Sequence, residues 1–251
     1  MQQILGLLFI SISILKKKLK IFKSKSWRKF GLEFLSIFIA VISAFALNNW
    51  NENRISKHSE QKILSEIKNS LKIDAHDFNN NIYGNKLSLK ADSIFRNLLN
   101  GEKIKQDSIA LYYTILFRDY IPIVNKSAYE SLKANNLKTV ENDSLRIQII
   151  SLYDYYYSII EKLEYEVPEM KSYKNYFSRI NHLLFPYMEF DRNGDLKKIV
   201  GIEKLYSSEK QEILSYLWRM RDNRKFKLGR YDLILNEMKK LELNIEKELK
   251  Q

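Results

Sequence analysis

Residues 30–47 read FGLEFLSIFIAVISAFAL, an apolar stretch of eighteen residues whose single charged side chain is Glu33. As a helix with a rise of about 1.5 Å per residue, the stretch would extend roughly 27 Å, which is close to the roughly 30 Å hydrocarbon core of a bilayer. Residues 30–47 therefore predict one membrane-spanning helix. The alternative is a buried core helix of a soluble protein.

The flanks of the apolar stretch favour the membrane over a soluble core. Trp27 and Trp50 stand at its two ends, where amphipathic indoles prefer the headgroup layers, and polar asparagines follow it. We expect seven residues to anchor the helix at the two interfaces: Trp27, Arg28, Lys29, Glu33, Asn48, Asn49 and Trp50. Glu33 lies within a turn of Lys29, so a structural or anchoring role is favoured for it over a proton relay.

Charge predicts the orientation of this single-pass protein. Residues 1–50 carry eight basic side chains and one acidic side chain, all but Glu33 before the apolar stretch, so that +7 of the formal net charge of +12 lies there. Lys and Arg concentrate on the cytoplasmic side of membrane proteins. We therefore expect a cytoplasmic N-terminus, with the rest of the chain on the periplasmic side of a bacterial inner membrane.

A second apolar stretch, Ile4–Leu15, is too short to span a bilayer easily, and its lysines follow it instead of preceding it as in a secretory signal. Ile4–Phe22 is predicted to lie in the cytoplasmic interface, where its lysines meet anionic headgroups. A strained second span is the alternative. The domain prediction is thus a basic segment at 1–29, a transmembrane helix at 30–47 and an extracytoplasmic domain at 48–251.

The composition after the apolar stretch predicts an all-α, bundle-like soluble domain. The whole chain has only 7 Gly and 3 Pro in 251 residues, and it has no Cys and hence no disulfide or thiol site. Apolar residues recur at three- and four-residue spacing in segments 63–78, 87–98, 111–116, 128–133, 145–163, 173–184, 213–220 and 231–249.

The ends of these segments carry recognisable helix signals. The first is expected to continue directly from the transmembrane helix, and Asn142-Asp143 is expected to cap the segment at 145–163, which Pro168 ends or kinks. Ser208 with Gln211 predicts a capping box. The segment at 231–249 fits either a coiled-coil seam or packing within the domain, and packing within the domain is favoured.

No motif in the sequence carries chemistry. The three histidines, His58, His76 and His182, lack metal-ligand spacing, and residues 191–195 resemble a calcium loop but have the glycine at the wrong position, which predicts a turn. The tyrosine run at 153–157 should spread around a helix, with some rings buried and others exposed. We expect no catalytic residue, metal, cofactor or nucleic-acid partner, and we identify no small-molecule substrate.

Two stretches of the sequence form recognisable motifs. The first is Glu33 with the apolar stretch and Asn48-Asn49-Trp50-Asn51-Glu52, and the second is Ala128-Tyr-Glu-Ser-Leu-Lys133 followed by Asn142-Asp143-Ser144-Leu145-Arg146. Together they resemble an uncharacterised family of single-span membrane proteins found mainly in Bacteroidota, which has a similar Asn-Asn-Trp-Asn-Glu exit motif. The chain departs from the family at Leu32 and Ala46, where glycine and glutamine are common. The resemblance implies a membrane-anchored helical protein of unknown function.

These observations favour a non-catalytic interaction or scaffold module, anchored in the lipid bilayer, whose bundle meets a protein partner or a second copy of the chain. The alternative is a membrane-bound sensor or regulator that couples a periplasmic event to a cytoplasmic partner. A membrane-associated enzyme is the least favoured hypothesis, because no catalytic constellation is recognisable.

Overall fold

The computed structural model describes residues 25–250, with side chains from Arg28 onward. The segment Ile4–Phe22, which we predict to be interfacial, lies outside the described residues. The chain divides into two compact units, Met1–Ser59 and Glu60–Gln251.

A single uninterrupted helix, α2 (Lys25–Leu99), contains the apolar stretch and continues into the second unit. No proline falls in its sequence, so nothing removes a backbone donor along its length. Among the described residues, it is the one helix long and apolar enough to cross a membrane, and its most apolar window has a mean hydropathy of 2.2 and no buried residue. The separate helix predicted at 87–98 was wrong, because these residues belong to α2.

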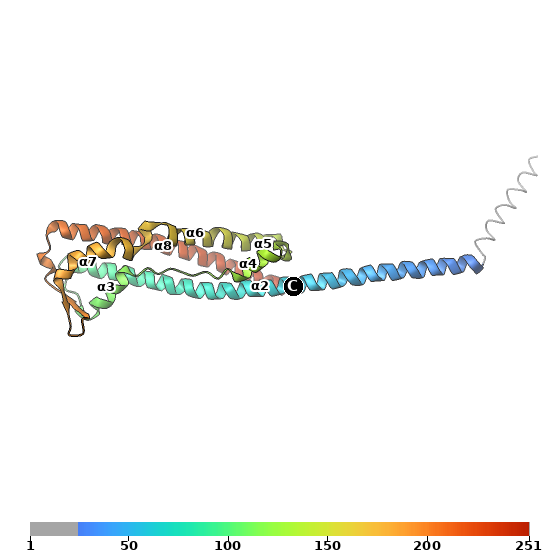
Figure 1. Ribbon diagram of the computed structural model, residues 1–251, viewed down its shortest axis with the longest axis horizontal. Helices are drawn as coiled ribbons and strands as arrows, with labels where there is room; N and C mark the ends of the chain where they lie inside the picture. Colours follow the sequence, from blue (N-terminus) through green and yellow to red (C-terminus); the bar gives the residue numbers. More distant parts are fainter. Residues whose placement is uncertain (1–24, 251) are drawn as a thin grey trace, which may run out of the picture. The chain divides into compact units, whose positions relative to one another are not determined.

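The second unit is an all-α bundle, as predicted. Its other long helix is α8 (Ser207–Glu248), and shorter helices lie alongside α2 and α8 (Figure 1): α3 (Ile109–Phe117), α4 (Ser127–Asn135), α5 (Asp143–Ile150), α6 (Tyr157–Glu161) and α7 (Ser178–Leu184). The C-terminus lies at the end of the bundle that holds α4, and α3 and α7 lie at the other end (Figure 1). The segments 213–220 and 231–249, predicted as two helices, both lie on α8.

Wider π-helical turns interrupt the helices between residues 151 and 177. They are η3 (Ser151–Tyr156), η4 (Lys162–Glu166) and η6 (Tyr173–Phe177). Helical periodicity does not distinguish a π turn from an α turn over so few residues, so the sequence predicted the helices and missed these turns. Single π turns often lie at functional sites.

Short 3-10 turns and a hairpin connect the helices. The turns are η1 (Gln106–Ser108), η2 (Leu137–Thr139), η5 (Pro168–Met170), η7 (Phe185–Tyr187) and η8 (Ile202–Lys204). The hairpin pairs β1 (Met188–Phe190) with β2 (Leu196–Ile199) in antiparallel register, Met188 opposite Ile199. The turn predicted at 191–195 joins the two strands, with Asp191 Oδ1 accepting from the backbone N–H of Asn193 at 2.8 Å. The two short strands themselves were not predicted.

The core of the bundle forms two clusters of buried side chains. The cluster near the C-terminal end includes Phe78 of α2 and Tyr231 of α8, whose rings meet edge to face at 5.6 Å. The cluster near the hairpin includes Phe95, Leu116 and Leu217. Because the apolar residues of 231–245 lie in the first cluster, they pack within the domain, and the tyrosine run splits as expected, Tyr153 and Tyr157 being buried and Tyr155 exposed.

Two predicted helix caps have different outcomes. Asn142 Oδ1 accepts from the backbone N–H of Leu145 at 3.1 Å, which confirms the cap of α5. The capping box of Ser208 with Gln211 was wrong, because α8 begins earlier, at Ser207, and Glu209 Oε2 instead accepts from the backbone N–H of Tyr206 at 3.0 Å.

Candidate functional site

The predicted interface anchors all lie on α2. The side chains of Arg28, Lys29 and Glu33 are exposed, and no ion pair joins them among the described residues; that of Trp27 lies outside the described side chains. The backbone carbonyl of Glu33 accepts from Ser36 Oγ at 2.8 Å. The structure therefore leaves these charged groups available to water or to headgroups.

At the other end of the apolar stretch, the exit residues bond to one another along the helix. Asn48 Nδ2 donates to Glu52 Oε1 at 2.7 Å, and the guanidinium of Arg54 lies 5.3 Å from the centre of the Trp50 ring. Asn49 is exposed, as is Trp50, which is 62% exposed. These contacts orient the indole and the Asn48 amide without burying either one.

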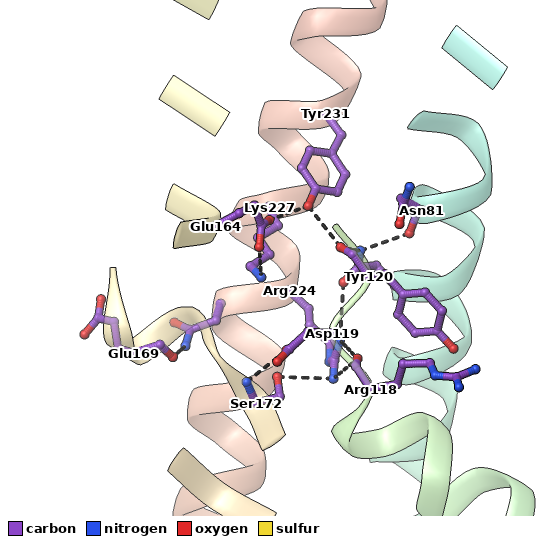
Figure 2. Close-up of polar contacts among 12 residues, drawn as sticks. Asn81, Arg118, Asp119, Tyr120, Glu164, Glu169, Ser172, Arg224, Lys227 and Tyr231 are labelled. Carbon is purple, nitrogen blue, oxygen red and sulfur yellow. Dashed lines mark hydrogen bonds and ion pairs between the residues drawn. The ribbon is translucent and has the colours of Figure 1, made fainter. Parts of the chain in front are cut away.

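Inside the bundle, Arg224 of α8 is 3% exposed and caps the C-terminal end of α3 (Figure 2). Its Nη2 donates to the carbonyl of Leu116 at 2.7 Å and to that of Arg118 at 3.3 Å. A guanidinium at this place satisfies carbonyls that have no partner within the helix, and its charge complements the helix dipole. Burial lowers the pKa of Arg224, and nearby Asp119 opposes this shift.

Asp119 caps the N-terminal end of the helical stretch that begins at Ser172. Its Oδ1 accepts from the backbone N–H of Ser172 at 2.9 Å, as an N-terminal cap supplied from elsewhere in the chain. Arg224 Nη2 also donates to Ser172 Oγ at 3.3 Å. Arg224 and Asp119 therefore tie the end of α3 to the start of η6, as Figure 2 shows.

A buried ion pair lies one turn further along α8. Lys227 Nζ donates to Glu164 Oε2 at 2.7 Å, and the two side chains are 5% and 1% exposed. The Tyr231 hydroxyl is hydrogen-bonded to Glu164 and lies 3.2 Å from the carbonyl of Tyr120 (Figure 2). Burial raises the pKa of Tyr231, and the Glu164 charge adds to this effect, so the phenol stays protonated and can donate.

Two carboxylates of α2 hold the extended segment 118–126 against the helix. Asp77 Oδ2 accepts from the backbone N–H of Ile123 at 2.8 Å, and Asp74 Oδ1 accepts from that of Asn125 at 2.8 Å. The other oxygen of Asp74 accepts from the Tyr157 hydroxyl at 2.8 Å. Burial raises the pKa of Asp74 to about 6, and these hydrogen bonds oppose the shift.

An aromatic cleft of about 500 Å³ lies between the C-terminal end of α3 and η6. Its lining, in full, is Tyr113, Thr114, Phe117, Arg118, Asp119, Tyr173 and Phe177. A volume of this size is in the range of small-molecule sites, which are lined mainly by apolar and aromatic side chains with a few polar groups. The cleft is the candidate functional site of the bundle.

The rings of the cleft pack against one another at several angles. Phe117 meets Tyr113 at 76° and Phe177 at 83°, both with ring centres 5.2 Å apart. Tyr173 stacks on Phe177 with the ring centres 4.6 Å apart and the planes 12° apart. The π turn η6 begins at Tyr173 and ends at Phe177, so its geometry sets this stacking.

In the described part of the chain, no group of three His, Asp or Glu side chains is arranged so that it could hold a metal ion. His76 lies near Asn80 Nδ2 at 3.1 Å, and His182 packs near Phe185. Neither ring belongs to the cleft.

Sequence reasoning did not identify Arg224, Lys227 or the residues of the cleft. The signal for the first two was present, because both fall in the unbroken three- and four-residue spacing of the apolar residues of α8. A charged residue within such a stripe must be buried and paired. Nothing in the sequence places α3 beside η6, so the cleft needed the tertiary structure.

No protein-family model, curated protein or solved structure matches the chain. What the chain does has to be inferred from its own residues.

Proposed function

We propose that this chain is a membrane-tethered, non-catalytic interaction module whose helical bundle stands on the periplasmic side of a bacterial inner membrane. The observation that carries the proposal is the exposure of the apolar part of α2. Phe34 is 71% exposed, Ile39 55% and Phe45 65%, and the apolar window has no buried residue.

Such a surface is unfavourable in water. Soluble proteins rarely expose contiguous apolar patches of more than a few hundred Å². A core helix of a soluble protein would bury these side chains, and in the described residues no other element covers them. A bilayer removes the whole surface from water and satisfies the backbone within the helix itself.

The bundle has the features of a binding module. Its polar interior is used for capping helices and holding the segment 118–126, and its surface carries exposed aromatic residues such as Trp218 at 53% and Tyr206 at 75%. Aromatic side chains are enriched at the centres of protein interfaces. These residues support a protein partner, or a second copy of the chain, as what the bundle meets.

One observation favours the sensor as a second candidate. The helix that carries the apolar stretch also carries Asp74 and Asp77, which hold the segment 118–126. A ligand that moved this segment would change hydrogen bonds on a helix that continues to the membrane. A sensor would then need a cytoplasmic partner for its output.

The tether is tested by placing two charges in the apolar stretch. We expect Ile39→Lys with Ile42→Lys to release the full chain from sedimented membranes, because each lysine costs about 2.5–3.5 kcal/mol at the centre of a span. The control is Ile73→Lys, since Ile73 is on the same helix, 61% exposed and within the bundle unit. If the double variant stays in carbonate-washed membranes, the tether is wrong.

The interaction role is tested by crosslinking in the cell. A photoreactive side chain at Trp218 should yield a discrete adduct with the wild-type tether and lose it in the released double variant. Adducts that survive release of the chain, or none at Trp218 and Tyr206, would contradict a membrane-localised interaction module.

A further inference from the structure

The aromatic cleft is not part of the apolar stretch, and polar side chains of the bundle hold its two walls. Arg224 donates to Leu116 and Arg118 on one wall and to Ser172 on the other, and Asp119 accepts from Ser172. Both walls are thus fixed to α8 through buried polar groups. A site held in this way loses little entropy when a ligand enters.

Two hydroxyl groups that line the cleft, those of Tyr113 and Thr114, already have acceptors. The Tyr113 hydroxyl donates to Asn181 Oδ1 at 2.8 Å, and the Thr114 hydroxyl donates to the carbonyl of Ala110 at 3.1 Å. The Arg118 side chain leaves the extended segment on the side opposite Asp119 (Figure 2), as alternation along an extended backbone requires. An anionic ligand would therefore find the Tyr113 and Thr114 hydroxyls already engaged.

Groups that attract a cation remain. Asp119 is half-buried, and of its two oxygens only Oδ1 has a hydrogen bond among the described residues. Tyr173 is 59% exposed and Phe177 is half-buried, so both rings are within reach of a ligand. Aromatic faces attract cations by about 0.5–2 kcal/mol each. The Asp119 carboxylate, whose charge also acts on buried Arg224, supplies the counter-charge.

We propose that the cleft binds a small organic cation, of the quaternary or substituted ammonium class, with its charge beside Asp119 and its alkyl groups against Tyr173 and Phe177. The cleft volume of about 500 Å³ accepts a small molecule and excludes a folded partner. The surrounding aromatic rings replace water around a weakly hydrated ammonium ion at little cost. This inference does not depend on the membrane tether or on its orientation.

The test uses the full chain in lipid nanodiscs and three probes of nearly equal shape. They are choline, the neutral 3,3-dimethylbutan-1-ol and the anionic 3,3-dimethylbutanoate, each titrated by calorimetry against empty nanodiscs as the blank. We expect choline to bind roughly 10-fold more tightly than the alcohol, and the anion to bind most weakly. Equal binding of choline and the alcohol, tighter binding of the anion, or no binding of choline would each overturn the proposal.

Two variants assign the binding to the cleft. Asp119→Asn keeps an oxygen that can accept from Ser172 and removes the charge, so choline affinity should fall roughly 10-fold while affinity for the alcohol changes little. The control is Asp232→Asn, at an exposed aspartate on α8. An equal loss of both probes in Asp119→Asn, or the same loss in the control, would overturn the assignment.

The aromatic wall gives an independent variant in case Asp119→Asn disturbs the fold. Tyr173→Ala truncates an exposed ring and should weaken choline several-fold with an unchanged far-UV circular dichroism spectrum. Tyr155→Ala is its control, because Tyr155 is 60% exposed and lies outside the cleft. Unchanged choline binding in Tyr173→Ala would overturn the role of the rings. Arg118→Gln should leave choline binding equal or tighter, and a loss would point to an anion.

Discussion

The ring of Tyr120 lies directly against Gly84 of α2. A side-chain carbon at Gly84 would lie 2.2 Å from Tyr120 Cδ1, so no other residue fits there without movement. Glycine costs a helix about 1 kcal/mol relative to alanine. At this position it allows the segment 118–126 to approach α2 closely, where Asn85 Nδ2 also donates to the carbonyl of Tyr120 at 3.4 Å.

We predict that Gly84→Ala destabilises the bundle although alanine is the better helix former. Moving the Tyr120 ring should cost about 1–3 kcal/mol, which exceeds the gain in propensity. The control is Gly229→Ala, because Gly229 lies in α8 with nothing within 4 Å of the added carbon. Urea unfolding of the full chain in detergent should show a lower midpoint for Gly84→Ala and a higher midpoint for Gly229→Ala. A stabilising Gly84→Ala would mean that the ring does not lie there.

Asp74 predicts a pH dependence with a definite sign. Its pKa is raised from the ordinary value of 3.8 to about 6, chiefly by burial and with a smaller contribution from Asp77. The folded chain therefore binds a proton more tightly than the unfolded chain. Protonation of Asp74 stabilises the folded chain below the unfolded pKa. This stabilisation is lost as pH rises from about 4 to about 6, and Asp74 causes no further change above that range.

Asp74→Asn removes this titration. Asparagine can still accept from the Asn125 N–H, and its amide can donate to the Tyr157 oxygen. We expect the free energy of unfolding of wild type relative to Asp74→Asn to fall by on the order of 1–2 kcal/mol between pH 4 and pH 7, after allowance for solvent screening. Asp232→Asn serves as the exposed control. If the free energy of unfolding depends on pH in the same way in wild type and in Asp74→Asn, the pKa of Asp74 is not raised.

The Lys227–Glu164 ion pair predicts that the single substitution Lys227→Met lowers the free energy of unfolding more than the double substitution does. Lys227→Met should lower the free energy of unfolding by about 3–5 kcal/mol, because it leaves the Glu164 carboxylate buried without a counter-charge. Adding Glu164→Leu should recover much of the lost stability. The recovery should be incomplete, because the Tyr231 hydroxyl loses Glu164 as its acceptor. Thermal unfolding of the two single variants and the double variant measures the coupling. Additive losses would show that the pair does not interact.

Much of the fold could be predicted because apolar residues recur at helical spacing over most of α8 and over the bundle part of α2. On α8 the spacing of buried residues runs unbroken through Leu217, Arg224 and Tyr231. The prediction divided this helix because the apolar spacing lacks apolar residues at two positions, which Arg224 and Lys227 occupy. Treating them as buried polar members of it would have given one helix and pointed to the buried network.

The same error divided α2. Asn85, Ser88 and Asp92 are all buried and continue the apolar spacing from Phe78 to Phe95. Asp92 pairs with Arg96 on the same helix, whereas Ser88 Oγ donates to the carbonyl of Ile115 at 2.9 Å, on a distant part of the chain. Sequence spacing shows that a polar residue is buried, but it does not show which distant group satisfies it, so the cleft and its supports could not be predicted.

The orientation across the membrane stays a prediction, and a pair of reporters tests it. Alkaline phosphatase fused after Gln251 should be active, because the basic residues before Phe30 keep the N-terminus in the cytoplasm. A fluorescent protein that matures only in the cytoplasm should stay dark at the same position. The opposite pattern would overturn both the orientation and the periplasmic placement of the bundle.

The exit residues Asn48, Asn49 and Trp50 predict how deep the helix sits. Trp50 follows Trp27 by 23 residues, roughly 34 Å along a helix, which matches two interfacial layers that flank a core of about 30 Å. The Arg54 guanidinium over the Trp50 ring supports an indole held at a polar boundary. The asparagine amides would be costly to bury unpaired in hydrocarbon, so they mark where the backbone leaves it.

We predict that Trp50→Ala shifts the depth or tilt of the helix and leaves insertion and the bundle intact. Single cysteines placed at positions 44–56, in a chain that has no native cysteine, report the boundary through their reaction with a membrane-impermeant maleimide. Without the indole, the reactive boundary should move by a residue or more, because nothing else at this end prefers the headgroup layer as strongly. Trp218→Ala is the matched control, since Trp218 is 53% exposed on α8 and far along the chain from the apolar stretch. If the boundary stays in place while a cellular phenotype is lost, Trp50 contacts a partner at the membrane surface, and the anchoring role is wrong.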